Sequence, residues 1–553
     1  MTNKEIAKSF SLLGDLMELH KENPFKVKSY QSAYIILRKM DEPLEEMNIA
    51  ELEAIKGIGK AIAEKIRELV STGKMTLLEK FREKTPPGVI EMLQLPGFGP
   101  KKVYQIWQDL QVESIGELWY ACNENRLTEL SGFGTKTQED LKKKIEYFQK
   151  SRNKKLFADI EPSIDRILEK LKTVLPDAKI ETTGAIRRLN PTIERLEFII
   201  GTDKSIDLLF TDDFLVLESS KDDTYLAKTA IDELPVCIYL CKPGEFGSKQ
   251  FLHTASAGFL DIFINKNIGL EFKGIETEEA VFEKAGWKFI APELREPIHD
   301  DFTALAEAKL ITDADIRGVV HTHTTYSDGL HDLREMVYHA QSLNYEYIVI
   351  SDHSQSAFYA NGLNPERVMQ QMAEIDALNK GMRDFKIFKS IESDILFDGR
   401  LDYRPELLSQ FDLVIASVHS NLKMDNDKAT SRIIKAIENP YTSILGHPTG
   451  RLLLSRQGYP VNIRKIIDAC AANGVAIELN ANPWRLDLDW SCIPMALQKG
   501  VLISINPDAH SKEGIRDIHY GILAARKGGL TKENCLNALS AEDFEKFCNK
   551  RKI

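Results

Sequence analysis

No long hydrophobic run interrupts this sequence of 553 residues. The beginning lacks the apolar core of a signal peptide. No segment approaches the roughly 20 consecutive apolar residues that a membrane-spanning helix requires. We therefore expect a protein that has no membrane partner and that works in the cytoplasm.

Cysteine is scarce, with seven residues in the whole chain. An odd number without zinc-ribbon spacing favours free thiols in a reducing compartment over a disulfide framework. The seven are Cys122, Cys237, Cys241, Cys470, Cys492, Cys535 and Cys548.

The sequence also lacks an excess of basic residues, since its formal net charge is −11. Residues 1–150 hold equal numbers of basic and acidic side chains, so the excess acid lies in residues 151–553. Any affinity for nucleic acid must therefore be local. A chain of this length with 43% hydrophobic residues is expected to form several domains.

Three similar glycine turns mark the first 150 residues, each set in apolar sequence with helical periodicity. Such a turn exposes backbone N–H groups beside a helix N-terminus, where a DNA phosphate can bind without base readout. Three copies with nearby lysines favour helix-hairpin-helix DNA binding over simple helix packing. The expected DNA-binding residues are Gly57, Gly59, Lys60, Gly97, Gly99, Lys101, Lys102, Gly132 and Gly134.

A possible metal site lies in residues 318–329, where His321, His323 and Asp328 follow a predicted strand. Residues i and i+2 of a strand point to the same side, so two imidazoles can face one ion. Taken alone, such a pair is more often structural than a pair of ligands. The rest of the C-terminal half changes this balance.

Six further β-branched runs follow His323, and each ends in polar residues that could bind a metal. Helical patterns at 332–343, 365–379 and 461–473 lie between them. Strands that alternate with helices predict a parallel sheet, and a closed barrel of this kind collects its functional side chains at the C-terminal strand ends. The runs span 347–350, 385–388, 413–416, 443–445, 475–479 and 501–505.

These blocks resemble the polymerase and histidinol phosphatase (PHP) domain of bacterial family X DNA polymerases, and the resemblance extends over the whole chain. The matching blocks are His-x-His with Ser-Asp-Gly, Ser-Asp-His-Ser, Ile-Glu-Ser-Asp-Ile, Ser-Val-His-Ser, Gly-His-Pro-Thr-Gly-Arg, Glu-Leu-Asn-Ala-Asn-Pro and Asp-Ala-His. The resemblance implies a helical lyase-like DNA-binding domain at 1–80 and a helix-hairpin-helix fingers-like domain at 81–150. It further implies an α+β nucleotidyltransferase-like palm and thumb at 151–300 and a distorted (β/α)7 PHP barrel at 301–553.

The resemblance also implies a trinuclear metal centre held by nine residues, of which Glu392, Asp508 and His321 would act most directly in catalysis. One ion would bind His321, His323, Glu392 and Asp508, a second Glu392, His419 and His447, and a third Asp328, His353 and His510. An inert barrel is the alternative, but so many titratable groups at one site would be costly to desolvate without cations. Mixed imidazole and carboxylate ligands suit zinc, manganese or iron, and magnesium is possible.

The segment that resembles a palm has lost the residues expected for nucleotidyl transfer. The resemblance implies three aspartates that hold Mg²⁺, but Arg195, Glu197 and Cys237 stand at their positions. We expect polymerase activity to be lost, although Asp203 or Asp207 could supply substitute carboxylates. Lys65 matches the Schiff-base lysine of family X lyases, yet an exposed helix lysine is the simpler interpretation.

Three classes of function follow. The leading hypothesis is a DNA-repair nuclease of the nucleoid, acting as a 3′-5′ exonuclease or 3′-end processing enzyme on gapped, nicked or 3′-ended DNA as a monomer. A small-molecule phosphatase would leave the hairpins unused. A non-catalytic DNA-binding scaffold would leave nine metal-binding residues unexplained.

Overall fold

The structure is a computed structural model that describes residues 1–550 except 41, 124–126, 128, 129, 131, 152, 272, 300, 301 and 456. The chain divides into two units, Met1–Arg152 and Asn153–Ile553. The division into four domains therefore stays a prediction, and its boundary at 300 and 301 lies outside the described residues.

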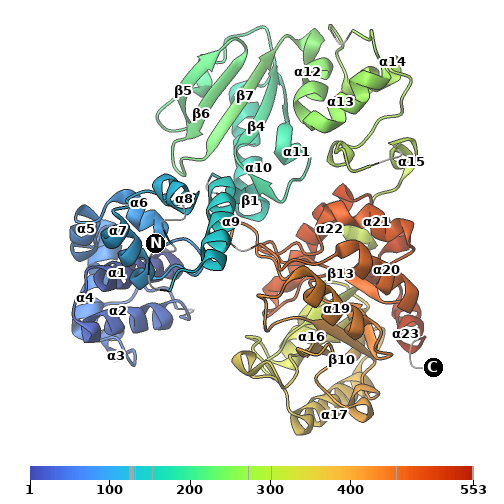
Figure 1. The fold of residues 1–553 in the computed structure, drawn as a ribbon. Coiled ribbons are helices and arrows are strands. Elements are labelled where there is room, and N and C mark those ends of the chain that lie inside the picture. The colour runs from blue at the N-terminus through green and yellow to red at the C-terminus, as the bar shows by residue number, and fades with distance from the viewer. Residues whose placement is uncertain are drawn as a thin grey trace. The chain divides into compact units, whose positions relative to one another are not determined.

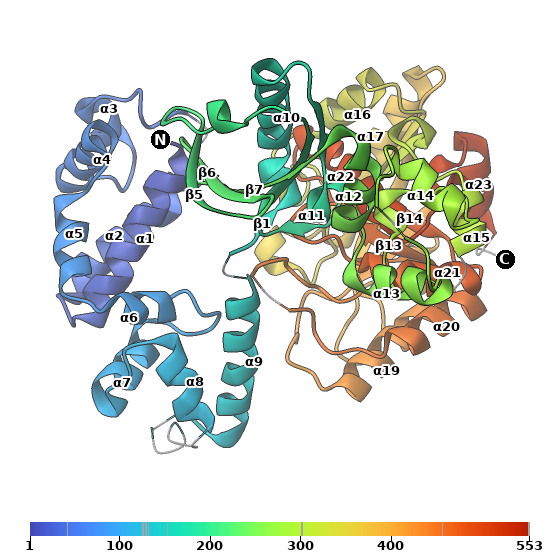
Figure 2. The ribbon, with the colours of Figure 1, turned by 90° about the horizontal axis from the view of Figure 1, so that it is seen from above.

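The first unit is helical (Figures 1 and 2). Its core is built by buried apolar side chains such as Phe10, Leu52, Ile66 and Val103. Within a single helix the buried residues recur at helical spacing, as Ile6, Phe10, Leu13 and Met17 do in residues 3–19. The helices are α1 Asn3–Leu19, α2 Pro24–Leu37, α3 Ile49–Ala54, α4 Lys60–Thr72, α5 Thr76–Glu83, α6 Pro87–Met92, α7 Pro100–Leu110, α8 Ile115–Asn123 and α9 Thr135–Ser151.

The three glycine turns share one geometry. The first glycine of each, Gly57, Gly97 or Gly132, has φ between +81° and +97°, a conformation that other residues adopt at a cost. The second glycine is the N-cap of α4 or α7, and no side chain caps either helix. A Cβ built on Gly59, Gly99 or Gly134 would meet nothing within 4 Å. Backbone N–H groups at these helix starts are therefore accessible to an anion.

The second unit begins with a five-stranded sheet of order β2-β4-β7-β6-β5. In this sheet β4 and β7 are parallel and the other pairs are antiparallel. The short β1 pairs with β3 outside it. The bounds are β1 Lys155–Leu156, α10 Phe157–Val174, β2 Lys179–Thr182, α11 Gly184–Arg187, β3 Thr192–Ile193, β4 Leu196–Gly201, β5 Leu215–Lys221, β6 Thr224–Thr229 and β7 Pro235–Cys241.

Four helices follow this sheet and form a separate core rich in phenylalanine (Figure 1). Phe251, Phe259, Phe263 and Phe282 are fully buried there, and their rings meet edge to face or tilted except for the stacked pair of Phe259 and Phe263. The helices are α12 Phe246–Thr254, α13 Ala257–Lys266, α14 Glu278–Lys284 and α15 Phe302–Glu307.

The remaining residues form a seven-stranded parallel sheet in the order β14-β13-β12-β11-β10-β9-β8. A bridge from Thr322 to Ala509 joins its two edges, so the barrel is nearly closed. The strands are β8 Gly318–Thr322, β9 Tyr347–Ile350, β10 Lys386–Asp394, β11 Leu413–Ser417, β12 Thr442–Leu445, β13 Ala476–Asn480 and β14 Ile503–Asn506. The helices are α16 Leu333–Ser342, α17 Pro365–Gly381, α18 Pro405–Leu408, α19 Asn426–Ile437, α20 Ile463–Asn473, α21 Ile493–Gln498, α22 Ile518–Lys527 and α23 Ala541–Asn549.

The predicted barrel is confirmed, and the ends of its strands agree with the predicted runs to within two residues except at β10. The sequence predicted a strand over 385–388 with Glu392 after it, but β10 continues to Asp394 and contains Glu392. Its last five residues are all buried although most are polar, because they face the functional end of the barrel. Apolar periodicity alone does not reveal such an extension.

Ion pairs connect the five-stranded sheet and its helices to the barrel within this second unit. Lys527, at the end of α22, is fully buried, and its Nζ donates to Glu296 Oε1 at 3.0 Å and to the Arg188 carbonyl at 2.8 Å. Burial lowers the pKa of Lys527 to about 8 despite the Glu296 carboxylate. Arg526 also donates to Glu293.

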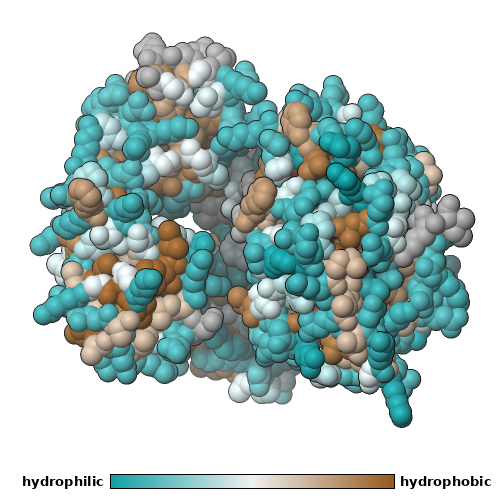
Figure 3. Space-filling view, turned by 90° about the horizontal axis from the view of Figure 1, so that it is seen from below, coloured by the Kyte–Doolittle hydropathy of each residue, from teal (hydrophilic) through white to brown (hydrophobic). Residues whose placement is uncertain are grey.

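Among the described residues, no helix combines the length and apolar character needed to cross a membrane. Figure 3 shows one face of the protein, on which apolar residues lie in small groups among hydrophilic ones.

Candidate metal centre

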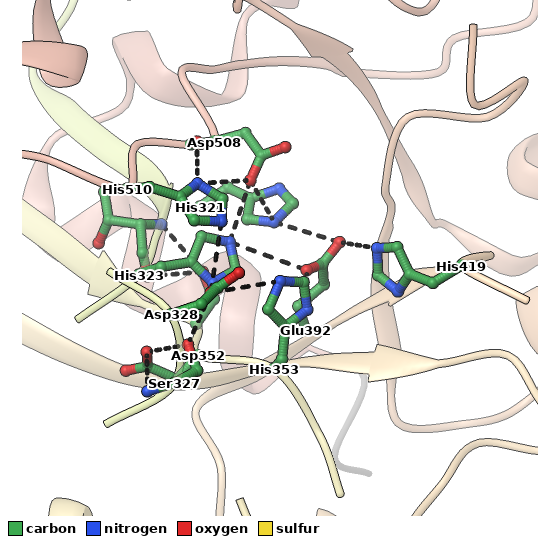
Figure 4. A network of polar contacts seen from close by, with 12 residues as sticks. His321, His323, Ser327, Asp328, Asp352, His353, Glu392, His419, Asp508 and His510 are labelled. Atoms are coloured by element: carbon green, nitrogen blue, oxygen red, sulfur yellow. Dashed lines mark hydrogen bonds and ion pairs between the residues drawn. The ribbon is translucent and has the colours of Figure 1, made fainter. Parts of the chain in front are cut away.

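The side chains at the C-terminal ends of the barrel strands converge on one another (Figure 4). His321 and His323 lie at the end of β8, with ring centroids 5.2 Å apart. Regular alternation along a strand would predict this arrangement, but β8 shifts register between Val319 and Thr322, and His321 has φ +67°. A β-bulge, rather than the plain pleat, turns both imidazoles inward.

The two edges of the barrel meet at this bulge. The Ala509 N–H donates to the His321 carbonyl, and the His323 N–H donates to the Ala509 carbonyl. This brings Asp508 Oδ1 to 3.0 Å from His323 Nε2. His510 Nε2 lies 3.4 Å from Asp328 Oδ1 in the loop that follows β8. Residues almost 190 positions apart in the chain thus form one cluster.

Glu392 lies at the centre of this cluster. Its Oε1 is 3.1 Å from His419 Nε2 and 3.0 Å from His447 Nε2. Its Oε2 is 2.8 Å from His353 Nδ1. Because Glu392 is only 1% exposed, its negative charge depends on these imidazoles or on a bound cation for compensation.

The predicted ligands form three groups in which one ligand atom from each residue lies within 4.8 Å of the others. These groups are His323, Asp328, His353 and His510; His321, His323 and Asp508; and His353, Glu392 and His419. His323 and His353 each belong to two groups, whereas the sequence assigned each to one ion. His447 belongs to none of them, although it contacts Glu392.

The atoms around His321 Nε2 fit a cation. This nitrogen is buried and has no hydrogen-bond partner among the described residues. Glu392 Oε1 lies 3.4 Å from it and Asp508 Oδ1 3.5 Å from it. Two ligands that each lie about 2.1 Å from one tetrahedral ion are about 3.4 Å apart. The spacing therefore suits shared coordination better than a direct hydrogen bond.

The charges of this cluster shift the pKa of its members in opposite directions. Burial opposes ionisation throughout, yet the surrounding histidines hold the pKa of Glu392 and Asp508 well below the ordinary value. Burial alone would lower the pKa of His419 and His510, but nearby carboxylates raise it to about 10 and about 9. For His323, burial and two neighbouring histidines lower the pKa to about 3.

Two buried carboxylates outside the predicted ligand set hold histidines of the cluster. Glu478 Oε2 lies 2.6 Å from His321 Nδ1, and Asp394 Oδ1 lies 2.5 Å from His419 Nδ1. A carboxylate on one ring nitrogen fixes the ring and its tautomer, so that the other nitrogen can face a metal. Neither role was predicted from the sequence, although Glu478 is a charged residue within an otherwise apolar run.

Glu478 also connects the ends of neighbouring strands. Its Oε1 accepts the His447 N–H at 3.1 Å and the Asn480 side-chain amide at 3.0 Å. Its Oε2 accepts the Asn506 amide at 2.8 Å. Asn480 donates in addition to Asp508 Oδ2. One fully buried carboxylate thus fixes residues of β8, β12, β13 and β14 around the cluster.

In the five-stranded sheet, the single carboxylate of the expected triad is used by the protein itself. Glu197 Oε2 accepts the Ala185 N–H at 3.0 Å, and its Oε1 accepts the Tyr239 hydroxyl at 3.1 Å. A Cβ at Gly184 would lie only 1.9 Å from Glu197 Oε2. Glu197 therefore lies against the start of α11.

The other two positions of the triad differ from each other in exposure. Arg195 is exposed just before β4, whereas Cys237 is buried opposite Glu197 in the sheet. Burial raises the pKa of the Cys237 thiol, so it stays protonated and is a poor metal ligand. Asp203 and Asp207 are exposed beyond the far end of β4. With about 3.3 Å per residue, that end lies roughly 13 Å from Glu197.

The chain matches two domain families. A helix-hairpin-helix domain matches residues 1–75, and the PHP domain matches residues 320–482. The DNA polymerase/3′-5′ exonuclease PolX of Bacillus subtilis (strain 168) is 32% identical over 569 residues, which cover 99% of each chain. The chain belongs to the bacterial family X DNA polymerases that carry a PHP domain. Its PHP domain is of a metal-dependent class, and the three groups described above could hold metal ions.

Relatives of the barrel alone are also found. A probable phosphatase of Thermoanaerobacter sp. (strain X514) is 27% identical over 228 residues, which cover 39% of this family X chain and 88% of the relative. A probable phosphatase of Acetivibrio thermocellus is 25% identical over 243 residues, with 42% and 95% covered. The barrel of this family X protein is therefore similar to proteins that consist of little else.

We expect Glu478→Gln to weaken metal binding by about 10- to 100-fold, because His321 would lose the carboxylate that orients its ring. Titration calorimetry with Mn²⁺ measures this change. Glu283→Gln, which alters an exposed residue of α14, serves as the matched control. Unchanged affinity in Glu478→Gln, with the fold intact by circular dichroism, would contradict the orienting role.

Metal binding should also release protons. His419 and His510, with pKa about 10 and about 9, are protonated at neutral pH without metal, and a ligand imidazole must be neutral. Affinity for Mn²⁺ is therefore expected to rise between pH 6 and pH 8. Calorimetry in two buffers of different ionisation enthalpy counts the released protons. A pH-independent affinity without proton release would exclude these histidines as ligands.

Proposed function

We propose that this chain is a DNA-repair nuclease whose PHP barrel hydrolyses DNA phosphodiesters from the 3′ end. The observation that carries this proposal is the convergence of histidines and carboxylates around His321 Nε2 and Glu392 at the open end of the barrel. The whole-length similarity to a DNA polymerase/3′-5′ exonuclease supports DNA as the substrate rather than a small phosphate ester.

The nine predicted ligands would hold three divalent ions, with zinc, manganese or iron suited to the mixed donor set and magnesium also possible. When bound, such ions lower the pKa of a water ligand and stabilise the charge of a phosphoryl displacement. Glu478 and Asp394 orient His321 and His419 for this task. Arg485, with Nε 3.7 Å from Asp508 Oδ2, places a guanidinium where it can bind a phosphodiester oxygen.

Polymerase activity is lost in this proposal. Glu197 accepts hydrogen bonds from Ala185 and Tyr239. Cys237 is a protonated thiol, and Arg195 adds a positive charge in place of a metal-binding carboxylate. The stacked rings of Tyr239 and His253, with centroids 3.7 Å apart, occupy the same region. The remaining sheet would position DNA without adding nucleotides.

The hairpins would bind gapped, nicked or 3′-ended DNA through backbone phosphates, with the chain acting as a monomer in the nucleoid. Lys60 and Lys101 are exposed at the starts of α4 and α7, and Lys102 lies over the rings of Phe98 and Phe133. Lys65 is partly exposed on α4, and a lyase role for it stays a prediction.

The central test is incubation of a labelled primer-template with the purified protein and Mn²⁺, with and without deoxynucleotides. We expect the primer to shorten in both cases. His321→Ala and Asp508→Ala should each abolish shortening while DNA affinity stays near wild type, and the exposed Asp468→Ala serves as a control. Templated extension would refute the loss of polymerase activity, and shortening by both variants would refute the metal centre.

A separate test concerns the hairpins. Each phosphate contact contributes about 0.9 to the slope of log affinity against log salt. Replacing Lys60, Lys101 and Lys102 by alanine should therefore flatten this slope by up to about three. The control replaces the exposed lysines Lys435, Lys465 and Lys499 on barrel helices. Equal slopes for both triple variants, measured by fluorescence anisotropy, would remove the hairpin lysines from the interface.

A further inference from the structure

Three loops at the functional end of the barrel each expose one large aromatic side chain. Phe358 is 90% exposed, Phe397 56% and Trp484 53%. They follow β9, which leads to His353, β10, which carries Glu392, and β13, which ends at Asn480. Because all strands are parallel, these loops surround the candidate metal centre.

Each loop is closed at its base by a backbone bridge. The bridges join Ser354 to Leu363, Ile395 to Leu401, and Asn480 to Asp487. Each bridge lies close to the cluster. Ser354 follows His353, Ile395 follows Asp394, which contacts His419, and Asn480 donates to Asp508. The aromatic residues are thus held at short, defined distances along the chain from the candidate ligands.

Side chains from elsewhere in the barrel hold the loops further. Arg432 of α19, itself only 4% exposed, donates from Nε to the Leu396 carbonyl at 2.9 Å. Arg451 Nε donates to the Arg485 carbonyl at 3.0 Å. The Ser356 N–H donates to Asp402 at 2.7 Å, which joins the first loop to the second. These hydrogen bonds fix the loops, so their aromatic rings are exposed in the folded protein.

Cationic groups accompany these rings. Lys428 Nζ lies 4.6 Å from the ring centroid of Phe397. Arg485 directly follows Trp484 and lies 3.7 Å from Asp508. An exposed ring adds little to the core, and loops that a rigid scaffold places beside a site often carry its binding residues. A flat apolar face next to a cation matches a nucleotide, whose base stacks while its phosphate pairs with the charge.

We propose that Phe358, Phe397 and Trp484 stack on unpaired bases that flank the scissile phosphodiester of single-stranded 3′ ends. This inference rests on the proposed nuclease function. A base in an intact duplex already stacks on its neighbours, so the rings favour substrates whose terminal bases are unpaired. Stacking tolerates every base, because all bases have a flat face, and the subsite therefore adds selectivity for strand state without selectivity for sequence.

The test compares two substrates with Mn²⁺: a single-stranded oligothymidylate, and bis(p-nitrophenyl) phosphate, which has no base. Phe358→Ala, Phe397→Ala and Trp484→Ala should each raise KM for the oligonucleotide by about fivefold or more. The value of kcat, and the hydrolysis of bis(p-nitrophenyl) phosphate, should stay near wild type. Trp484→Phe should retain most of the affinity. Tyr338→Ala, 53% exposed on the outer helix α16, is the matched aromatic control.

An oligonucleotide with abasic sites at its last two 3′ positions tests stacking directly. The KM of the wild type should be higher for this oligonucleotide than for the intact one. The KM of the triple alanine variant should differ little between the two oligonucleotides, since both changes remove the same contact. Additive effects, or an unchanged KM in all three single variants, would overturn the stacking proposal. If the wild type hydrolysed neither substrate, this result would instead overturn the nuclease function on which the stacking proposal rests.

Discussion

The barrel end is organised around one buried carboxylate, Glu392. Imidazoles of His353, His419 and His447 lie within 3.1 Å of its oxygens, and His321 Nε2 lies at 3.4 Å. An isolated carboxylate this deeply buried would be neutralised by a proton. The surrounding positive charge keeps the pKa of Glu392 low instead. Protonated histidines and a bound cation can each compensate the negative charge of this carboxylate. The side chains at the strand ends supply this compensation.

Most of this architecture could be predicted from the sequence, because buried parallel strands leave a simple pattern. Runs such as 347–350 and 413–416 are apolar and β-branched, and each became a strand. The predicted ligands could be placed because each follows such a run. The bulge at His321 could not, since its positive φ depends on hydrogen bonds to Ala509 at the other edge of the barrel.

The roles of Glu478 and Asp394 were hidden for a different reason. A single charged residue within an apolar strand can face solvent at the barrel end, bind a metal or hold another side chain. Only the fold shows that Glu478 meets the Nδ1 side of His321 and the amides of Asn480 and Asn506. Residues that act through others leave a weaker signal in one sequence than residues that repeat a known motif, because their partners come from distant strands.

The five-stranded sheet illustrates how a carboxylate at an expected metal-binding position can serve the fold itself. That Arg195, Glu197 and Cys237 stand where three aspartates are expected could be read from the sequence, but the contact of Glu197 with Ala185 could not. Arg188, which follows this turn, pairs with Glu296, and Glu296 in turn neutralises the buried Lys527 of α22. Removing Glu296 would leave the buried charge of Lys527 uncompensated, at a cost of about 3–5 kcal/mol. Since α22 packs on β13 and β14, these ion pairs link the turn after α11 to the strands that carry Glu478 and precede Asp508.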